Sequence, residues 1–332
     1  MNLQQRIDLL VRLGEYILSD DPQWKQAKAK AGQENAWFIP EFIDLAAGNI
    51  ARSFLQREIL MNWAAKYEIP SVTQNPKING IVMAGNIPLV GFHDLLAVFI
   101  SGHKAHIKPS SKDEVLIKHL CDKLTGWDEE TAERIQFPGM LKGCYAYIAT
   151  GSYNSSRYFD YYFGKYLHII RRNRTSVAIL TGNETNEELE KLADDVFLYF
   201  GLGCRNVTKI FVPVNYDFIP LLNAFKKYNY LADHNKYINN YDYNLALHIM
   251  NKKYYMTNGS VMLVEEASLF SPVSQLNYEF YDNEKTVVEF LRSSESIQCI
   301  VGNQHVPFGQ TQSPTISDYA DGVDTMKFLA GL

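Results

Sequence analysis

The sequence predicts an α/β protein built on parallel sheets with helices on both faces. Short apolar runs typical of buried strands alternate with longer segments that have helical periodicity. Gly, Pro and Ser residues separate the two kinds of segment. With 332 residues, the chain is also long enough for a large core and two domains.

The first half of the chain begins with helices and then alternates. Residues 3–18 place apolar side chains on one helical face, and residues 40–67 form a second helical stretch. The strands and helices that we expect next cover residues 80–84, 92–101, 104–108, 114–124 and 144–149. Ser110 or Ser111 is expected to cap the helix over residues 114–124.

The second half continues the alternation with less regularity. The expected strands and helices cover residues 176–180, 186–200, 209–214, 217–228, 261–264, 273–280 and 284–293. Residues 229–258 are rich in Tyr and Asn and carry no assignment. The tail after Pro307 is rich in Gly, Pro, Ser and Thr and is expected to be extended.

Composition excludes several classes of protein. Hydrophobic residues make up 46% and charged residues 21%, which is ordinary for a globular protein. The net charge of -5 argues against a general nucleic-acid binder. The charged, amphipathic start does not fit a signal peptide, and no segment fits an uncharged membrane span. Four widely spaced cysteines suggest no metal site and no disulfide framework, so we expect a cytoplasmic location.

Cys204 is the strongest candidate for a catalytic residue. It lies in the run Phe-Gly-Leu-Gly-Cys-Arg-Asn, between a helical segment and an apolar strand. A thiol among small residues at such a junction suits covalent acyl transfer, and Arg205 is placed to favour its thiolate. The alternative is a buried, inert structural cysteine.

Three loops that follow expected strands carry further candidates. The amide of Asn86 is a possible donor to an oxyanion, and Lys108 is placed to reach a ribose or a phosphate. The turn Thr150-Gly151-Ser152 exposes backbone N–H groups, although the fingerprint G-x-G-x-x-G is absent. Taken singly, each of the three also fits an ordinary turn or a solvated charge.

The order of these motifs resembles that of the aldehyde dehydrogenase superfamily. The motifs are G-N-I-P-L, I-K-P-S, T-G-S and G-L-G-C-R-N, followed more faintly by S-P-V and P-F-G. The resemblance runs from about residue 75 to the end. It implies two Rossmann-like α/β domains with an N-terminal helical layer and a C-terminal extended segment. The corresponding boundaries are 1–173 for the dinucleotide domain, 174–300 for the catalytic domain and 301–332 for a segment that joins subunits.

Within that superfamily, the chain is most similar to the fatty acyl-CoA reductases related to bacterial luminescence. The segment that usually carries the general-base glutamate is here Ile-Arg-Arg-Asn-Arg, residues 170–174. The glutamate that often follows K-P-S is Ser111, which would not repel a 2′-phosphate. The chain is also compact for the superfamily, as these reductases tend to be.

The resemblance implies that an acyl-CoA is reduced to an aldehyde through a thioester on Cys204, with Asn86 holding the oxyanion. NADPH is expected, with NADH less suited. The residues expected to bind it are Lys108, Ser110, Ser111, Gly151, Ser152 and Glu266. A homo-oligomer is also expected, and no metal.

Other readings remain open at this stage. The same scaffold serves aldehyde dehydrogenases and reductases of acyl phosphates, and a non-catalytic subunit of an acyl-transfer complex is a further alternative. Arg171, Arg172 and Arg174 fit either phosphate attraction or a solvated basic turn. His93, His103, His106 and His168 are candidate proton shuttles, although none has a distinguishing position.

Overall fold

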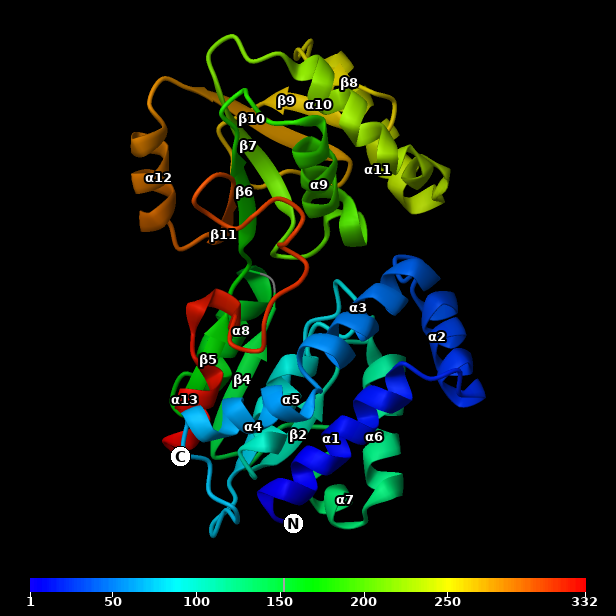
Figure 1. Cartoon of the computed structure of the whole chain (residues 1–332), viewed down its shortest axis with the longest axis vertical. Helices are drawn as coiled ribbons and strands as arrows, with labels where there is room; N and C mark the ends of the chain where they lie inside the picture. The colour runs from blue at the N-terminus through cyan, green and yellow to red at the C-terminus, as the bar shows by residue number, and fades with distance from the viewer. Residues whose placement is uncertain (152) are drawn as a thin grey trace. The chain divides into compact units, whose positions relative to one another are not determined.

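The chain folds into two compact units, which we describe separately. The computed structural model describes residues 1–151 and 153–332 (Figure 1). Unit 1 comprises residues 1–173 and 314–332, and unit 2 comprises residues 174–313. The chain therefore leaves unit 1, forms unit 2, and returns to unit 1 for its last segment.

Unit 1 is built on a parallel sheet whose strand order is β3-β2-β1-β4-β5. Its strands are β1 (Ile78–Val82), β2 (Lys104–Lys108), β3 (Ile135–Gln136), β4 (Ala146–Thr150) and β5 (Leu167–Arg171). After β1, the chain adds β2 and β3 on one side of β1 and then β4 and β5 on its other side. The topological switch point, where such folds bind nucleotides, is therefore between β1 and β4.

Nine helices lie in the described part of unit 1. They are α1 (Leu3–Ile17), α2 (Pro22–Glu34), α3 (Pro40–Ser53), α4 (Arg57–Lys66), α5 (Phe92–Ile100), α6 (Glu114–Trp127), α7 (Glu130–Arg134), α8 (Tyr153–Phe163) and α13 (Thr325–Ala330). One apolar core joins α1, α3, α5 and α6 to the central strands. The expected helix over residues 40–67 is two helices, α3 and α4, and α2 has no counterpart among the expected elements.

The tail after residue 313 packs onto unit 1. Trp63 donates from Nε1 to the hydroxyl of Tyr319 at 2.8 Å, and Arg171 donates to Oγ1 of Thr325 at 2.7 Å. Met326 and Leu329 are fully buried there. Instead of the expected extended segment, residues 307–319 form several turns, and the tail ends in the helix α13. Of the other apolar side chains of this tail, Ile316 is buried, whereas Val323 is 40% exposed.

Unit 2 is built on a second sheet, with strand order β11-β6-β7-β10-β9-β8. Its strands are β6 (Thr175–Ile179), β7 (Val207–Pro213), β8 (Met256–Thr257), β9 (Met262–Glu265), β10 (Gln275–Tyr281) and β11 (Ile297–Val301). All neighbours are parallel except β8 and β9.

The helices of unit 2 cover both faces of its sheet. They are α9 (Asn186–Phe197), α10 (Phe218–Ala224), α11 (Asn235–Met250) and α12 (Glu284–Ser293). Figure 1 shows α12 on one side of the sheet and α9, α10 and α11 on the other. Both units therefore have the predicted parallel α/β architecture, and α11 fills the stretch that carried no assignment.

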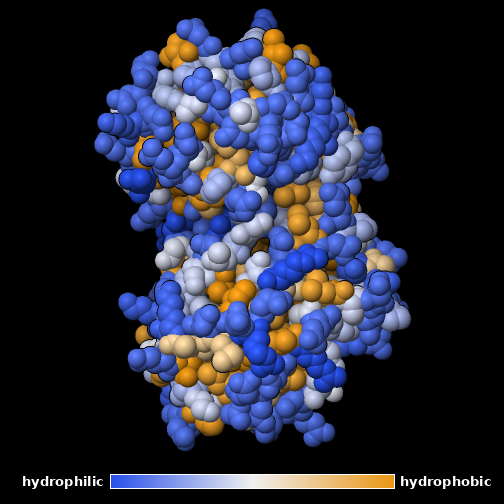
Figure 2. Space-filling view, viewed as in Figure 1, coloured by the Kyte–Doolittle hydropathy of each residue, from blue (hydrophilic) through white to orange (hydrophobic). Residues whose placement is uncertain are grey.

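The surface is that of an ordinary globular chain. On the face seen in Figure 2, hydrophilic residues dominate the surface of each unit, and apolar residues reach it in small patches. None of the helices among the described residues combines the length and the apolarity that a membrane span requires.

Candidate functional site

The candidate residues of unit 1 converge on one edge of its sheet. Asn86, Lys108 and Gly151 follow β1, β2 and β4, which are neighbouring parallel strands with Val82 level with Lys108 and Ala149. Because parallel strands end at the same edge, these residues share the switch-point edge. The side chains of Asn86 and Lys108 are exposed. Ser152 lies outside the described residues.

The Asn86 loop, residues 85–89, rests on the segment that follows β2. A Cβ added at Gly85 would lie 2.6 Å from Oγ of Ser110, so only glycine allows this approach. Ser110 is partly buried by the contact, and Ser111 remains exposed. The structure thus brings the G-N-I-P-L and K-P-S motifs into direct contact.

Asp113 is a residue of this edge that the sequence did not reveal. It stands at the N-cap of α6, where Ser110 or Ser111 was expected, and its side chain is 3% exposed. Its Oδ2 accepts a hydrogen bond from the backbone N–H of Leu89 at 2.7 Å. Burial raises the pKa of this carboxyl well above its ordinary value. An acidic residue before a helix predicts a cap but gives no sign of this distant contact.

In unit 2, Cys204 lies on a short loop between the 3₁₀ turn η1 (Leu198–Gly201) and β7. It is partly exposed, whereas Cys121, Cys144 and Cys299 are buried. Of the four thiols, that of Cys204 is therefore the best placed to meet a substrate.

Asn206 fixes this loop, and its side chain is fully buried. Oδ1 accepts from the N–H of Gly203 at 2.8 Å. Nδ2 donates to the carbonyls at the end of α9, those of Asp195 (3.1 Å), Val196 (3.4 Å) and Leu198 (2.8 Å). One amide thus satisfies the end of the helix and sets the path of the chain through Cys204. Its place in the motif G-L-G-C-R-N was the available signal.

Two neighbouring side chains complete the surroundings of the loop. Ser176 donates from Oγ to the carbonyl of Cys204 at 3.1 Å. The guanidinium of Arg205 reaches the sulfur of Cys299 at 3.4 Å. Arg205, which was expected to favour the thiolate of Cys204, therefore contacts a different thiol, on β11.

Asp195 links α9 to the P-F-G segment. Its buried carboxylate accepts from the N–H of Gly309 at 2.7 Å and from the N–H and hydroxyl of Thr311 at 3.0 and 2.7 Å. Burial raises the pKa of Asp195 to about 6, against the lowering effect of these hydrogen bonds. Its position within a helical segment of the sequence does not predict this contact.

Glu266 directly follows β9. Glu265, the last residue of β9, is level with Tyr278 of β10 and therefore with Ile210 in the middle of β7. The carbonyls of Ala267 and Leu269 then accept hydrogen bonds from Lys209 and Thr208 near the amino end of β7, which Cys204 precedes. Glu266 is ion-paired with Lys253 at 2.5 Å, and the hydrogen bond from Lys253 lowers its pKa.

Arg171 is not part of a solvated basic turn. Its side chain is buried, forms an ion pair with Asp94 at 2.5 Å and donates to Thr325 of the tail. Arg172 is exposed and pairs with Asp160, and Arg174 donates to the carbonyl of Ile297. The phosphate-binding interpretation of Arg171 is therefore wrong, because its charge is already neutralised inside unit 1.

The candidate histidines serve mainly structural contacts. His93 and His103 meet the carbonyls of Ile316 and Leu329 in the tail. Burial lowers the pKa values of His103 and His106. His168 is exposed, with Nδ1 2.8 Å from the carbonyl of Tyr166.

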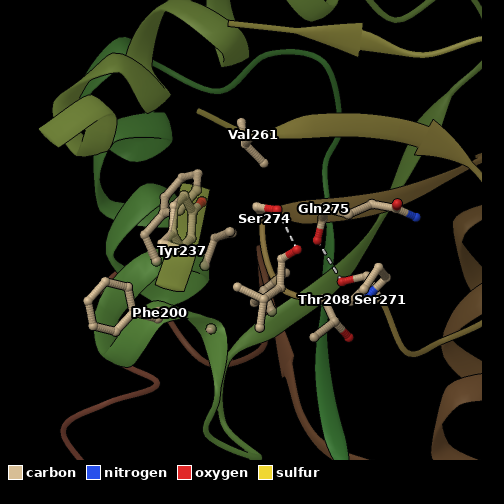
Figure 3. A pocket seen from close by; sticks show the side chains of 13 residues that line it. Phe200, Thr208, Tyr237, Val261, Ser271, Ser274 and Gln275 are labelled. Atoms are coloured by element: carbon tan, nitrogen blue, oxygen red, sulfur yellow. Dashed lines mark hydrogen bonds between the residues drawn. The ribbon is translucent and has the colours of Figure 1, made fainter. Parts of the chain in front are cut away.

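Two hollows in the described residues do not fit the expected ligands. In unit 2, a cavity of about 20 Å³ lies among Phe200, Tyr237 and residues 271–275 (Figure 3), which is room for about one water. In unit 1, an open groove of about 700 Å³ between α2 and α6 carries Lys30 and Lys118 beside acidic partners on the same helices. Paired lysines of this kind leave no excess positive charge for phosphates.

Comparison with known proteins identifies the fold. No protein-family model matches the chain, and no curated protein sequence matches it. An aldehyde dehydrogenase of Mycobacterium tuberculosis complexed with NAD+ superposes with a TM-score of 0.67 at 12% identity, over 94% of this chain and 76% of that one. An indole-3-acetaldehyde dehydrogenase of P. syringae, in complex with NAD+ and IAA, gives 0.65 at 10% identity over 87% and 69%.

A third structure, the NAD+ complex of an aldehyde dehydrogenase from Bacillus cereus, gives a TM-score of 0.61 at 14% identity, over 89% of this chain and 70% of that one. The chain therefore has the aldehyde dehydrogenase fold, as the motif order predicts. At these identities the likeness establishes the fold alone.

Proposed function

We propose that this chain is a nicotinamide-dependent oxidoreductase that reduces an acyl-CoA to an aldehyde through a thioester on Cys204. The observation that carries the proposal is the Cys204 loop. Within an aldehyde dehydrogenase fold, it presents a partly exposed thiol on a backbone that Asn206 and Ser176 hold in place. A nucleophile needs both access and a fixed position.

The switch-point edge of unit 1 suits a dinucleotide. Lys108 and Lys112 are exposed cations on either side of Ser110 and Ser111, and this segment precedes the amino end of α6. Ser111 carries no charge that would repel a 2′-phosphate, which favours NADPH over NADH. In the proposal Lys108, Ser110, Ser111 and Gly151 bind NADPH, and Glu266 keeps the cofactor-binding role that the motif order assigns to it.

The proposed reaction begins with attack of the Cys204 thiolate on the acyl carbonyl. The backbone N–H of Cys204 donates a hydrogen bond to the resulting oxyanion, and the motif order assigns a further donor role to the amide of Asn86. The new C–S bond replaces the bond to CoA, which leaves as a thiolate and takes up a proton. When bound, NADPH supplies the hydride that converts the thioester to an aldehyde, and Cys204 is released as the thiolate.

The missing general base supports reduction rather than hydrolysis. Residues 170–174 contain no carboxylate, and Arg171 is committed to Asp94. A hydrolytic dehydrogenase needs a base that activates water, whereas exchange of a thioester with the thiol of CoA does not.

The test is intact-mass spectrometry of the protein after mixing with acyl-CoAs of graded chain length, without NADPH. We expect one acyl adduct, located on Cys204 by peptide mapping, and its disappearance with release of aldehyde when NADPH is added. A protein that forms no adduct with any chain length contradicts the proposal.

An aldehyde dehydrogenase that uses NAD+ is the second candidate, because the solved neighbours include NAD+ complexes. Stopped-flow absorbance of the nicotinamide separates the two. Loss of NADPH with acyl-CoA supports the reductase, whereas formation of NADH from NAD+ and free aldehyde in the absence of CoA supports the dehydrogenase.

A further inference from the structure

Asp113 differs from the other Asn, Asp and Thr residues that stand at the N-caps of the described helices. Among the helices whose caps the structure describes, six begin after an Asn, Asp or Thr whose side chain accepts an N–H of its own first turn, namely α1, α2, α9, α10, α12 and α13. Such a bond stabilises the helix end. Asp113 makes no bond of this kind to α6. Its carboxyl group is used for a contact elsewhere.

That contact is with Leu89, 24 residues earlier in the chain. Oδ2 of Asp113 accepts the backbone N–H of Leu89 at 2.7 Å, and both residues are almost fully buried. Leu89 has a φ of 58°, in the left-handed region that is unfavourable for leucine. Such a conformation persists only where the surroundings hold it, and the bond to Asp113 is one of the contacts that does so.

The other end of the Asn86 loop rests on the same segment. Gly85 packs against Ser110, and an added Cβ there would also lie 3.3 Å from Cβ of Asp113. Asp113 in turn donates its N–H to the carbonyl of Ser110 at 3.0 Å. Residues 85 and 89 are therefore both fixed to residues 110–113, and Asn86 lies between the two fixed points.

We propose that Asp113 is a positioning residue that holds the Asn86 loop against the segment carrying Ser110 and Ser111. The consequence for catalysis rests on the proposed function. NADPH bound at Ser110 and Ser111 then restrains the segment that positions Asn86, and an ordered Asn86 loop favours NADPH in return. Such a coupling is reciprocal by thermodynamic necessity.

The carboxyl group suits this role in its neutral form. Oδ1 is buried and has no hydrogen-bond partner among the described residues. Burial raises the pKa of Asp113 well above its ordinary value, which favours the uncharged acid. The bond to Leu89 requires only an acceptor oxygen at Oδ2, so an asparagine can supply it.

Three variants separate the loop contact from the stability of α6. Asp113→Ser supplies a short side chain that is a good helix cap but does not reach Leu89. Asp113→Asn retains an acceptor oxygen at the same distance. Asp122→Asn makes the same chemical change at an exposed position on α6 and serves as the control.

Hydrogen exchange of peptides covering residues 85–91, with and without NADPH, reports on the loop directly. For Asp113→Ser we expect exchange to be about tenfold faster and NADPH to protect the loop less than in the wild type, because the bond to Leu89 is lost. We also expect its affinity for NADPH and its rate of Cys204 acylation each to fall by about fivefold or more. Asp113→Asn should remain within about threefold of the wild type, and Asp122→Asn should not differ.

Unchanged exchange of residues 85–91 in folded Asp113→Ser would overturn the proposal, whether or not Cys204 is acylated. A loosened loop with normal NADPH affinity and normal acylation would overturn the coupling. Should the serine variant not fold, Gly85→Ala disturbs the same contact from the other side and is expected to change exchange in the same direction. A wild-type protein that neither binds NADPH nor forms a thioester refutes the proposed function, and exchange alone then decides whether Asp113 holds the loop.

Discussion

The Cys204 loop of unit 2 and the Asn86 loop of unit 1 are held by different means. Asn206 stands two residues after Cys204, and every bond of its side chain is made to residues 195–203. The Asn86 loop is instead held by Asp113, from a segment beyond the next helix and strand. The first loop is a local structure, and the second depends on the tertiary fold.

This difference implies different vulnerabilities. The hydrogen bonds that fix the Cys204 loop form together with the loop itself, and they are lost when the single amide of Asn206 is removed. The bond that fixes the Asn86 loop joins two elements that are distant in the sequence. Ligands that bind either element can therefore influence it. We therefore expect changes at unit 2 to act on chemistry and stability, and changes at unit 1 to act on dinucleotide binding and, at Asp113, also on acylation.

The largest effect is expected for Cys204→Ser. Serine is a much weaker nucleophile than a thiolate, so turnover should fall by about 10³-fold or more while NADPH affinity is unchanged. Stopped-flow absorbance and fluorescence titration measure the two quantities. Labelling with iodoacetamide provides a further check, because only Cys204 is not buried and should take up the first equivalent. Near-normal turnover would show that another residue is the nucleophile.

Removing the amide of Asn206 tests the local hold. Asn206→Ala leaves three carbonyls and one N–H without their partner, so the free energy of unfolding should fall by about 4 kcal/mol. Urea denaturation of unit 2 measures this, with the exposed Asn186→Ala as the matched control, for which we expect a change within about 0.5 kcal/mol. Equal stability of the two variants would mean that the loop does not depend on Asn206.

The buried Asp195 predicts a pH dependence of stability. Its pKa rises from 3.8 to about 6 on folding, so the folded state binds more protons between these values. The group therefore lowers the stability as the pH rises from about 4 to about 6, by about 3 kcal/mol in total.

Asp195→Asn cannot ionise and should lack this component. Urea denaturation at pH 4.5 and pH 7 measures the free energy of unfolding of the wild type and of the variant. The difference between their changes with pH gives the contribution of the Asp195 carboxyl group. Parallel pH profiles would indicate that Asp195 is ionised at little cost in the folded state.

The smallest effect is expected at Ser111 in unit 1. Ser111→Glu introduces a carboxylate that would repel the 2′-phosphate, so the affinity for NADPH should fall about tenfold relative to that for NADH. Ser111→Ala is the neutral control, and neither variant should change acylation of Cys204 in the absence of dinucleotide. Equal affinity of the wild type for NADPH and NADH would show that Ser111 does not favour NADPH.

Much of the fold could be predicted because most elements bury an apolar face. The strand at residues 104–108 and the helix at residues 284–293 have the predicted bounds. The helices α2 and α11 were not predicted because they bury few side chains. The side chains that α11 buries are Tyr237, Tyr241 and Asn244 rather than aliphatic residues. Periodicity of apolar residues cannot reveal a helix of that kind.

For the candidate site, prediction reached the motifs but not the residues that hold them. Asn86, Lys108 and Gly151 follow strands, so the parallel topology places them at one edge. The partners that hold the loops are harder to see. In the sequence, Asp113 is an acidic residue before a helix and Asp195 is an acidic residue within one. Only the tertiary fold shows that Asp113 contacts Leu89 and that Asp195 contacts Gly309 and Thr311.

The return of the tail to unit 1 has a consequence for synthesis. Unit 2 is continuous in the chain, so it is able to fold on the ribosome as soon as residue 313 has emerged. Unit 1 must wait for Tyr319 to reach Trp63 and for Thr325 to reach Arg171, and both of these tail residues are synthesised after the whole of unit 2. Unit 1 is therefore completed after unit 2, although most of its residues precede unit 2 in the chain.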